Sequence, residues 1–200
     1  AQLEAYLWFR TRGRPFVTLK LAASLDGRTA APDGSSQWIT GHEARVDVHR
    51  LRAEVDGILV GAGTVRADNP SLDVRHVDGT NPTRVVLGVA PADAAVHPCI
   101  ELSGPLPEVL DELARRGIVD LLVEGGAQVA ADFHRHGLVN RYLIYLAPVL
   151  FGGDDGRPVF AGPGAATIDD VWRGQMTSVR HLGDDIAIEI RPQRPTIGGS

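Results

Sequence analysis

The feature that most constrains this chain is an alternation between short strand-type runs and segments of helical spacing. The strand-type runs are rich in Val, Ile and Leu, and the segments between them repeat apolar residues every three or four positions. Such an alternation is typical of βαβ units, which build a mainly parallel sheet. The strand-type runs cover residues 16–23, 57–61, 84–89, 119–123 and 141–147, and the helical segments cover 41–53, 107–116 and 126–137.

The two ends of the chain complete the domain prediction. Residues 178–191 alternate around Gly183-Asp184 and predict a terminal antiparallel hairpin. Thr40 and Glu43, three positions apart, predict a capping box at the start of the first helix. We therefore expect one α/β domain over 15–192, a lead-in helix or linker over 1–14, and a flexible tail over 193–200.

Charge and cysteine content exclude several classes of protein. The chain carries 20 Lys+Arg against 25 Asp+Glu, so its net charge of −5 disfavours binding to nucleic acid. A single cysteine, Cys99, permits no intrachain disulfide and no cysteine pair for a metal. No apolar run reaches the ~18–20 residues of a membrane span. These observations predict a soluble, cytoplasmic protein that binds no membrane.

Two glycine-containing turns follow strand-type runs and are candidates for binding an anion. Gly125-Gly126 opens a helix after the 119–123 run, and Gly61-Ala62-Gly63-Thr64 closes the 57–61 run. Backbone N–H groups at such turns can hold a phosphate, although tight turns without a ligand look the same. The dinucleotide fingerprint G-x-G-x-x-G is absent. Two turns at one sheet edge would suit a single elongated ligand.

Three ionisable residues near these turns are candidates for catalysis. Lys20 lies inside an apolar strand, Asp68 follows the Gly63-Thr64 turn, and Glu124 directly precedes the glycines. A lysine in such a strand is costly unless it faces a polar cleft. The alternatives are an edge lysine that reaches water, a turn-forming aspartate and a helix-capping glutamate.

Arginines provide candidate contacts to a phosphate. Arg45 and Arg52 share one face of the 41–53 helix, and Arg75 lies in the loop after Asp68. Two of them converging on a pocket would form a forked clamp, whereas each alone is typical of a solvated surface. Trp38 lies in a polar loop, where a large aromatic side chain needs a covering partner. His134 and His136 lack metal-ligand spacing, so no metal site is expected.

Together these motifs resemble the riboflavin-biosynthesis pyrimidine reductase, the reductase half of a bifunctional deaminase/reductase. Four motifs in the same order carry the resemblance, which covers residues 8–92 and 106–152. The motifs are PFVTLKLAASLDGRTA (15–30), SSQWITGHEARVDVHRLRA (35–53), GILVGAGTVRADNPSLDVR (57–75) and LLVEGG (121–126).

The resemblance implies a fold, a cofactor and a reaction. The fold would be a three-layer α/β fold similar to dihydrofolate reductase, usually as a homodimer. NADPH would supply hydride to reduce the ribosyl group of 5-amino-6-(5-phosphoribosylamino)uracil to a ribityl chain. Lys20 matches a substrate-side lysine of the family and, with Asp68 and Glu124, would act on the opened ribose.

The resemblance also implies binding residues at matching positions. The substrate would contact Ser36, Arg52, Asp68, Arg75 and Glu124. NADPH would contact Ala22, Trp38, Thr64, Asp68, Ser71, Gly126, Ala127, Gln128, Val129, Ala130, Ala131 and Asp132.

The chain departs from the family pattern in two places. The segment between Gly88 and Pro107 is shorter than usual, which affects the adenosine end of the cofactor site. The zinc deaminase motifs H-x-E and P-C-x-x-C are absent, so this chain is not expected to deaminate. The alternatives are a reductase of the same fold for 2,5-diamino-6-ribosylamino-pyrimidinone 5′-phosphate or a pterin, a non-catalytic nucleotide-binding domain, and a purely structural α/β module.

Overall fold

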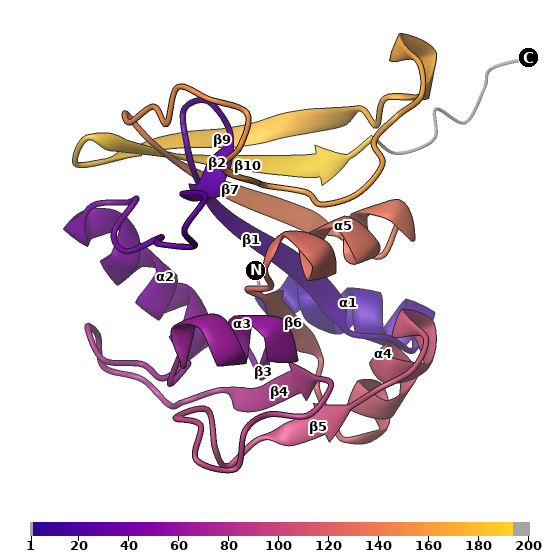
Figure 1. Cartoon of the computed structure of the whole chain (residues 1–200). Helices are drawn as coiled ribbons and strands as arrows, with labels where there is room; N and C mark the ends of the chain where they lie inside the picture. Colours follow the sequence, from indigo (N-terminus) through magenta and orange to yellow (C-terminus); the bar gives the residue numbers. More distant parts are fainter. Residues whose placement is uncertain (1, 194–200) are drawn as a thin grey trace, which may run out of the picture.

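The computed structural model describes residues 2–193, which form a central eight-stranded sheet and a small two-stranded one (Figure 1). The strand order of the large sheet is β5-β4-β3-β6-β1-β7-β10-β9, and the small sheet pairs β2 with β8. The strands are β1 (Phe16–Ser24), β2 (Arg28–Ala30), β3 (Gly57–Gly61), β4 (Thr83–Leu87), β5 (Ile100–Leu102), β6 (Asp120–Val123), β7 (Arg141–Ala147), β8 (Arg157–Pro158), β9 (Gly174–Leu182) and β10 (Asp185–Pro192).

The large sheet is parallel from β5 to β7 and antiparallel at its C-terminal end. β7 pairs antiparallel with β10, which pairs antiparallel with β9. The predicted mainly parallel sheet with a C-terminal hairpin is therefore confirmed. Because β1, β3 and β6 are parallel neighbours, their carboxyl ends meet at one edge of the sheet.

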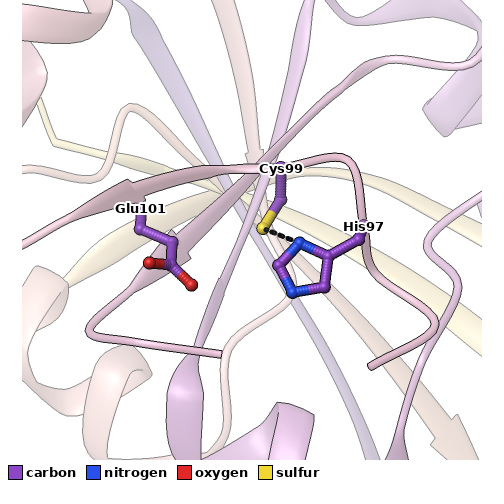
Figure 2. A group of neighbouring side chains, drawn as sticks. All are labelled: His97, Cys99 and Glu101. Atoms are coloured by element: carbon purple, nitrogen blue, oxygen red, sulfur yellow. Dashed lines mark hydrogen bonds between the residues drawn. The ribbon is translucent and has the colours of Figure 1, made fainter. Parts of the chain in front are cut away.

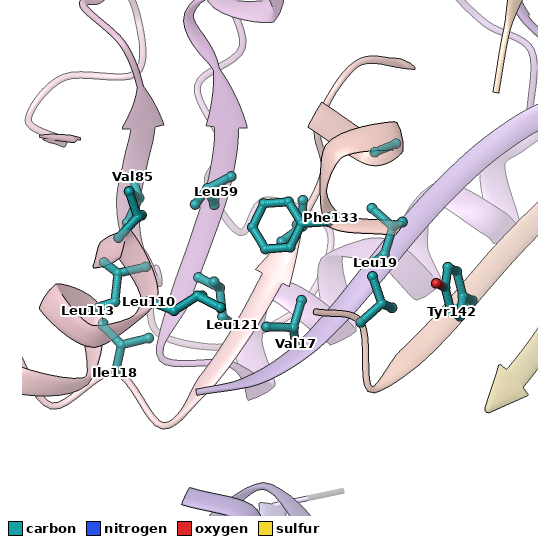
Figure 3. Close-up of a cluster of buried hydrophobic side chains, with 14 of the residues drawn as sticks. Val17, Leu19, Leu59, Val85, Leu110, Leu113, Ile118, Leu121, Phe133 and Tyr142 are labelled. Atoms are coloured by element: carbon teal, nitrogen blue, oxygen red, sulfur yellow. The ribbon is translucent and has the colours of Figure 1, made fainter. Parts of the chain in front are cut away.

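Helices cover both faces of the sheet, which gives three layers. α4 and α5 pack on one face around Leu59, Leu121 and Phe133 (Figure 3). α2 and α3 pack on the opposite face, against side chains that alternate with those of the first face. The helices are α1 (Gln2–Arg12), α2 (His42–Glu54), α3 (Ala62–Asp68), α4 (Leu106–Arg115), α5 (Ala127–Arg135) and the 3₁₀ turn η1 (Ile168–Asp170).

The start of α2 differs from the sequence prediction. The helix is capped by Gly41 and has no side-chain cap, so the predicted Thr40–Glu43 capping box is wrong. The Gly41 N–H instead donates to the Asp185 carboxylate, at 2.6 Å. A partner from the distant β10 strand thus replaces the local cap.

Other differences lie in short elements. Residues 62–68, expected as a turn, form helix α3, and β2, β5 and β8 were not expected. Each of those three strands has only two or three residues, too few to show a periodic pattern.

The N-terminal segment is a helix that contacts the domain. Ala5 of α1 is buried, and Trp8 packs edge-on against Phe16 at the start of β1. Residue 1 and most of the predicted 193–200 tail lie outside the described residues. Within residues 2–193, every helix falls short of the length and apolar character that crossing a membrane requires.

Candidate functional site

A cavity of about 1330 Å³ opens at the carboxyl ends of β1, β3 and β6. Helices α2, α3 and α5 contribute to its walls, together with the loop before α2 and the loop after α3. This is the sheet edge at which parallel α/β folds bind their ligands. Lys20, Asp68 and Glu124, the three predicted catalytic residues, all line it.

The two glycine turns lie next to each other in this cavity. The Thr64 hydroxyl oxygen in the first turn of α3 accepts the N–H of Gly126, the N-cap of α5, at 3.1 Å. A Cβ on Gly125 would lie 2.6 Å from the Val129 side chain, so only glycine lets α5 start this close to the strand end. The N-termini of α3 and α5 therefore meet at one wall, and the first-turn N–H groups of a helix are suited to bind an anion.

A buried ion-pair cluster forms the centre of the cavity. The Arg52 guanidinium binds both carboxylate oxygens of Glu124, through Nε at 2.8 Å and Nη2 at 3.0 Å. The Lys20 Nζ lies 3.6 Å from Glu124 Oε2 on the other side. Lys20 is the one lysine in the sequence, and its side chain is only 17% exposed.

This cluster determines the protonation state of Glu124. Burial opposes its negative charge, but Arg52 and Lys20 outweigh that effect and lower the pKa of Glu124 to about 2. Glu124 is thus a carboxylate at neutral pH and cannot donate a proton. Lys20 carries N–H protons at the same place, inside the cavity.

All three guanidinium nitrogens of Arg52 donate hydrogen bonds, whereas Arg75 is bound less completely. The remaining terminal nitrogen of Arg52 donates to the Asp73 carbonyl oxygen at 3.1 Å. Arg75 is exposed, with its guanidinium near Asp73 and the Ser71 hydroxyl. Its side chain can therefore reach an anion without leaving a buried partner unpaired.

A neutral histidine fixes the backbone beside Arg75. Burial, together with the nearby Arg52 charge, lowers the pKa of His49 to about 4. Its Nδ1 accepts the Arg75 N–H at 3.1 Å, while its ring packs edge-on against His76. Both histidines line the cavity.

The loop before α2 forms the outer rim. The Trp38 ring is 67% exposed, and the Arg45 guanidinium stacks on it at 4.6 Å from the ring centre. Ser36 and Ala22 line the cavity nearby. Arg45 is therefore the covering partner that Trp38 was expected to need.

The structure brings most predicted binding residues to the cavity and leaves three outside it. Ala130 and Ala131 are buried in the protein, and the Asp132 carboxylate binds Arg135 on the surface of α5. Only the first turn of that helix faces the cavity, because its later turns carry it away from the strand end. The predicted residues that line the cavity are Lys20, Ala22, Ser36, Trp38, Arg52, Thr64, Asp68, Ser71, Arg75, Glu124, Gly126, Ala127, Gln128 and Val129.

Sequence reasoning missed several arginine and histidine residues of the cavity. Arg66 and Arg157 line it, as do His49 and His76. His49 precedes Arg52 by one helical turn, and this spacing could have identified it. Arg157 comes from β8, and no local pattern indicates its position.

The charge of the cavity is opposite to that of the whole chain. Six cationic side chains line it against two carboxylates, although the chain has a net charge of −5. The cationic residues are Lys20, Arg45, Arg52, Arg66, Arg75 and Arg157. A large cavity of this charge, beside two helix N-termini, fits phosphate-bearing ligands such as a dinucleotide.

Known proteins are similar to this chain in sequence and fold. The chain is 43% identical over 202 residues to the riboflavin biosynthesis protein RibD of Mycobacterium tuberculosis (94% of this chain, 58% of the relative). The solved structure of Acinetobacter baumannii RibD matches with a TM-score of 0.88 and 32% identity, over 96% of this chain and 62% of that one.

A third protein of known structure is also similar to this chain. It is a diaminohydroxyphosphoribosylaminopyrimidine deaminase/5-amino-6-(5-phosphoribosylamino)uracil reductase from Thermotoga maritima, with a TM-score of 0.82 and 31% identity. That match covers 95% of this chain and 60% of the other. The chain thus spans about three fifths of the length of these relatives.

The family model described as the RibD C-terminal domain matches residues 15–188. The match spans the whole sheet up to the middle of β10 and includes every residue that lines the cavity. This chain therefore belongs to the RibD C-terminal domain family.

Proposed function

We propose that this chain reduces the ribosyl group of 5-amino-6-(5-phosphoribosylamino)uracil to a ribityl chain in riboflavin biosynthesis, with NADPH as reductant. The observation that carries the proposal is the Lys20–Glu124–Arg52 cluster, buried in a cationic cavity beside the N-termini of α3 and α5. This arrangement offers a proton donor, a fixed anion and phosphate-binding groups within one cavity.

Lys20 is assigned as the proton donor. When bound, NADPH supplies the hydride that reduces C1′ of the ring-opened substrate. The nitrogen attached to C1′ must gain a proton in the same reduction, and the Lys20 ammonium can provide it and recover one from solvent. Glu124 orients Lys20 and accepts hydrogen bonds from ribose hydroxyls, because it stays a carboxylate.

Arg75 is assigned to the 5′-phosphate of the substrate. It lies at the cavity wall and its side chain is 55% exposed, so its guanidinium can turn from Asp73 to bind a phosphate through two parallel hydrogen bonds. Arg52 supports the same end indirectly, since Glu124 and the Asp73 carbonyl already occupy its three nitrogens.

NADPH is assigned to the wall formed by the two helix N-termini. Gly126 and Thr64 lie there, and the first-turn N–H groups of Ala127 to Val129 are suited to a diphosphate. Trp38, Ala22, Asp68 and Ser71 also line the cavity and are assigned to the same cofactor. Arg66 and Arg157 offer positive charge for the additional phosphate that distinguishes NADPH from NADH.

The homodimer implied by the family resemblance stays a prediction. β9 is an edge strand, and its apolar Met176 and Val179 are more than half exposed. Analytical ultracentrifugation of the native chain and of Val179→Lys tests whether this strand holds a second copy.

The decisive experiment follows NADPH absorbance with the uracil substrate. We expect oxidation that depends on the 5′-phosphate, with Arg75→Ala raising the KM for the phosphorylated substrate only. Faster turnover of the 2,5-diamino pyrimidinone or of a pterin would assign the chain to another substrate. Binding of NADPH without turnover of any of these substrates would indicate a non-catalytic nucleotide-binding domain.

A further inference from the structure

Three potential metal ligands lie together outside the cavity, at the edge strand β5. Glu101 lies in β5, while His97 and Cys99 precede the strand on either side of a bend at Pro98, and Figure 2 shows the three side chains gathered together. Their donor atoms all lie within 4.8 Å of one another. Sequence reasoning looked for cysteine pairs and histidine pairs, and therefore missed this mixed H-x-C-x-E pattern.

The histidine is already oriented by a backbone carbonyl. The His97 Nε2–H donates to the Pro91 carbonyl oxygen at 2.9 Å, because a carbonyl can only accept. Nδ1 is then the unprotonated nitrogen, and it accepts a hydrogen bond from the Cys99 thiol at 3.5 Å. Histidines that bind metals are typically oriented in this way, with the distal N–H on a carbonyl or carboxylate.

The glutamate is oriented in the same manner. One carboxylate oxygen of Glu101 accepts the Ala90 N–H at 2.8 Å, which leaves the other oxygen available. His97 and Glu101 are thus each held by a backbone partner in the 90–91 segment, and the Cys99 proton that His97 Nδ1 accepts would leave when a metal ion binds. The cluster therefore has both the ligands and the surrounding hydrogen bonds of a metal site.

The distances and charges fit a zinc-type ion. Zinc–sulfur and zinc–nitrogen bonds at a tetrahedral angle place the two ligand atoms about 3.6 Å apart. The observed Cys99–His97 separation is 3.5 Å, and the flexible, exposed Glu101 needs to move its oxygen inward by about 1 Å to complete the set. A thiolate and a carboxylate balance a divalent charge, although Arg84, which donates to the His97 carbonyl at 3.5 Å, opposes it.

We propose that His97, Cys99 and Glu101 bind one divalent ion of the zinc type, with water as the fourth ligand. The Cys99 thiol loses its proton to solvent when the ion binds. The ion would join the 90–97 loop to β5 beside the cavity wall formed by Val89 and Ala95. That loop is also tied to the end of α3, through the Ala95 N–H and the Asn69 side-chain oxygen.

Cobalt(II) titration of the tag-free full chain tests the proposal directly. Cys99 is the sole cysteine, so a near-ultraviolet thiolate-to-cobalt charge-transfer band reports on this site alone. We expect a band that saturates at one equivalent and is displaced by Zn²⁺. Competition with a chromophoric chelator should show that Cys99→Ser weakens Zn²⁺ binding more than about 100-fold, since even outer-shell changes cost 10–100-fold.

Matched variants separate this site from adventitious binding. His97→Ala and Glu101→Gln should also weaken Zn²⁺ binding, while His181→Ala, an exposed histidine on β9, should leave it unchanged. Zn²⁺ should protect Cys99 from alkylation, measured by mass spectrometry. Absence of the band, or equal Zn²⁺ affinity in Cys99→Ser and the native chain, would overturn the proposal. Because each readout is binding, the result does not depend on the proposed reductase activity.

Discussion

Two buried carboxylates lie at opposite ends of β6, and their pKa values shift in opposite directions. Asp120 begins the strand and is 6% exposed, while the Glu124 side chain, just after the strand, is 9% exposed. Burial raises the pKa of Asp120 to about 6; Arg141 opposes that rise only in part, and Asp56 adds to it. The pKa of Glu124 falls to about 2.

The difference comes from the partners of each carboxylate. Glu124 lies between Arg52 and Lys20, which together outweigh the cost of burial. Within residues 2–193, one Asp120 oxygen is buried without a hydrogen-bond partner, and Asp56 accepts the N–H groups of Val119 and Asp120 close by. Asp120, whose burial is only partly offset by Arg141, therefore destabilises the fold when it is charged. Glu124, paired with Arg52 and Lys20 at the cavity, stays charged at neutral pH.

The largest expected effect is on catalysis and comes from Lys20. Lys20→Met should lower kcat by about 10²–10⁴-fold, the range for removal of a general acid. NADPH absorbance with the uracil substrate measures this loss. Since Lys20 is the one lysine, isotopic methylation followed by NMR can observe its amine directly. Turnover within threefold of the native rate would remove Lys20 from the mechanism.

Removal of the Glu124 charge should have the largest effect on stability. Glu124→Gln leaves Lys20 and Arg52 buried without an anion, which should cost about 3–5 kcal/mol of unfolding free energy. Urea unfolding at pH 7.5 measures the change. Glu112→Gln is the matched control, because Glu112 pairs with Arg115 and Arg116 at the surface of α4 and its loss should leave the midpoint unchanged. Equal midpoints for both variants would contradict the proposed role of the cluster.

Asp120→Asn should increase the free energy of unfolding, whereas Glu124→Gln should decrease it. The raised pKa means that the folded state binds a proton more tightly than the unfolded state, so stability falls as pH rises from about 4 to about 6. Asn removes this dependence and should stabilise the chain by about 3 kcal/mol above pH 6, with no gain below pH 4. Glu124 behaves conversely, since its contribution is present above its unfolded pKa and is lost as pH falls toward 2. A uniform effect of Asp120→Asn at every pH would show that titration is not its cause.

Much of the fold was predictable because its signals are local. The 57–61 and 141–147 runs match β3 and β7 residue for residue, since β-branched and apolar residues mark strands without further context. Lys20 was also visible, as a lysine inside an apolar strand. By contrast, Gly63 concealed helix α3, because glycine is a poor helix former.

The site's electrostatics were not predictable, because they depend on long-range pairing. Arg52 and Glu124 lie 72 positions apart, and only the parallel pairing of β1 and β6 brings Lys20 beside both. Asp120 looks like any polar residue at a strand start, and its pKa is raised by burial in the folded chain, with a further contribution from Asp56. Sequence spacing identifies residues that could take part in binding or catalysis. Only the fold determines which of them lie close enough to interact electrostatically.

The smallest expected effect concerns the Thr64–Gly126 hydrogen bond, which follows Glu124 at the cavity end of β6. Thr64→Val keeps the shape of the side chain but removes the acceptor for the Gly126 N–H, a bond whose loss should cost about 0.5–1.5 kcal/mol. Because that bond joins the N-termini of α3 and α5, the variant should also raise the KM for NADPH. Thr177→Val, which removes the hydroxyl bond to Glu189 on β10, is the control and should leave that KM unchanged. Equal NADPH kinetics in both variants would mean that the Thr64–Gly126 bond supports the fold alone, and the contrast between the two ends of β6 would then rest on the ion pairs.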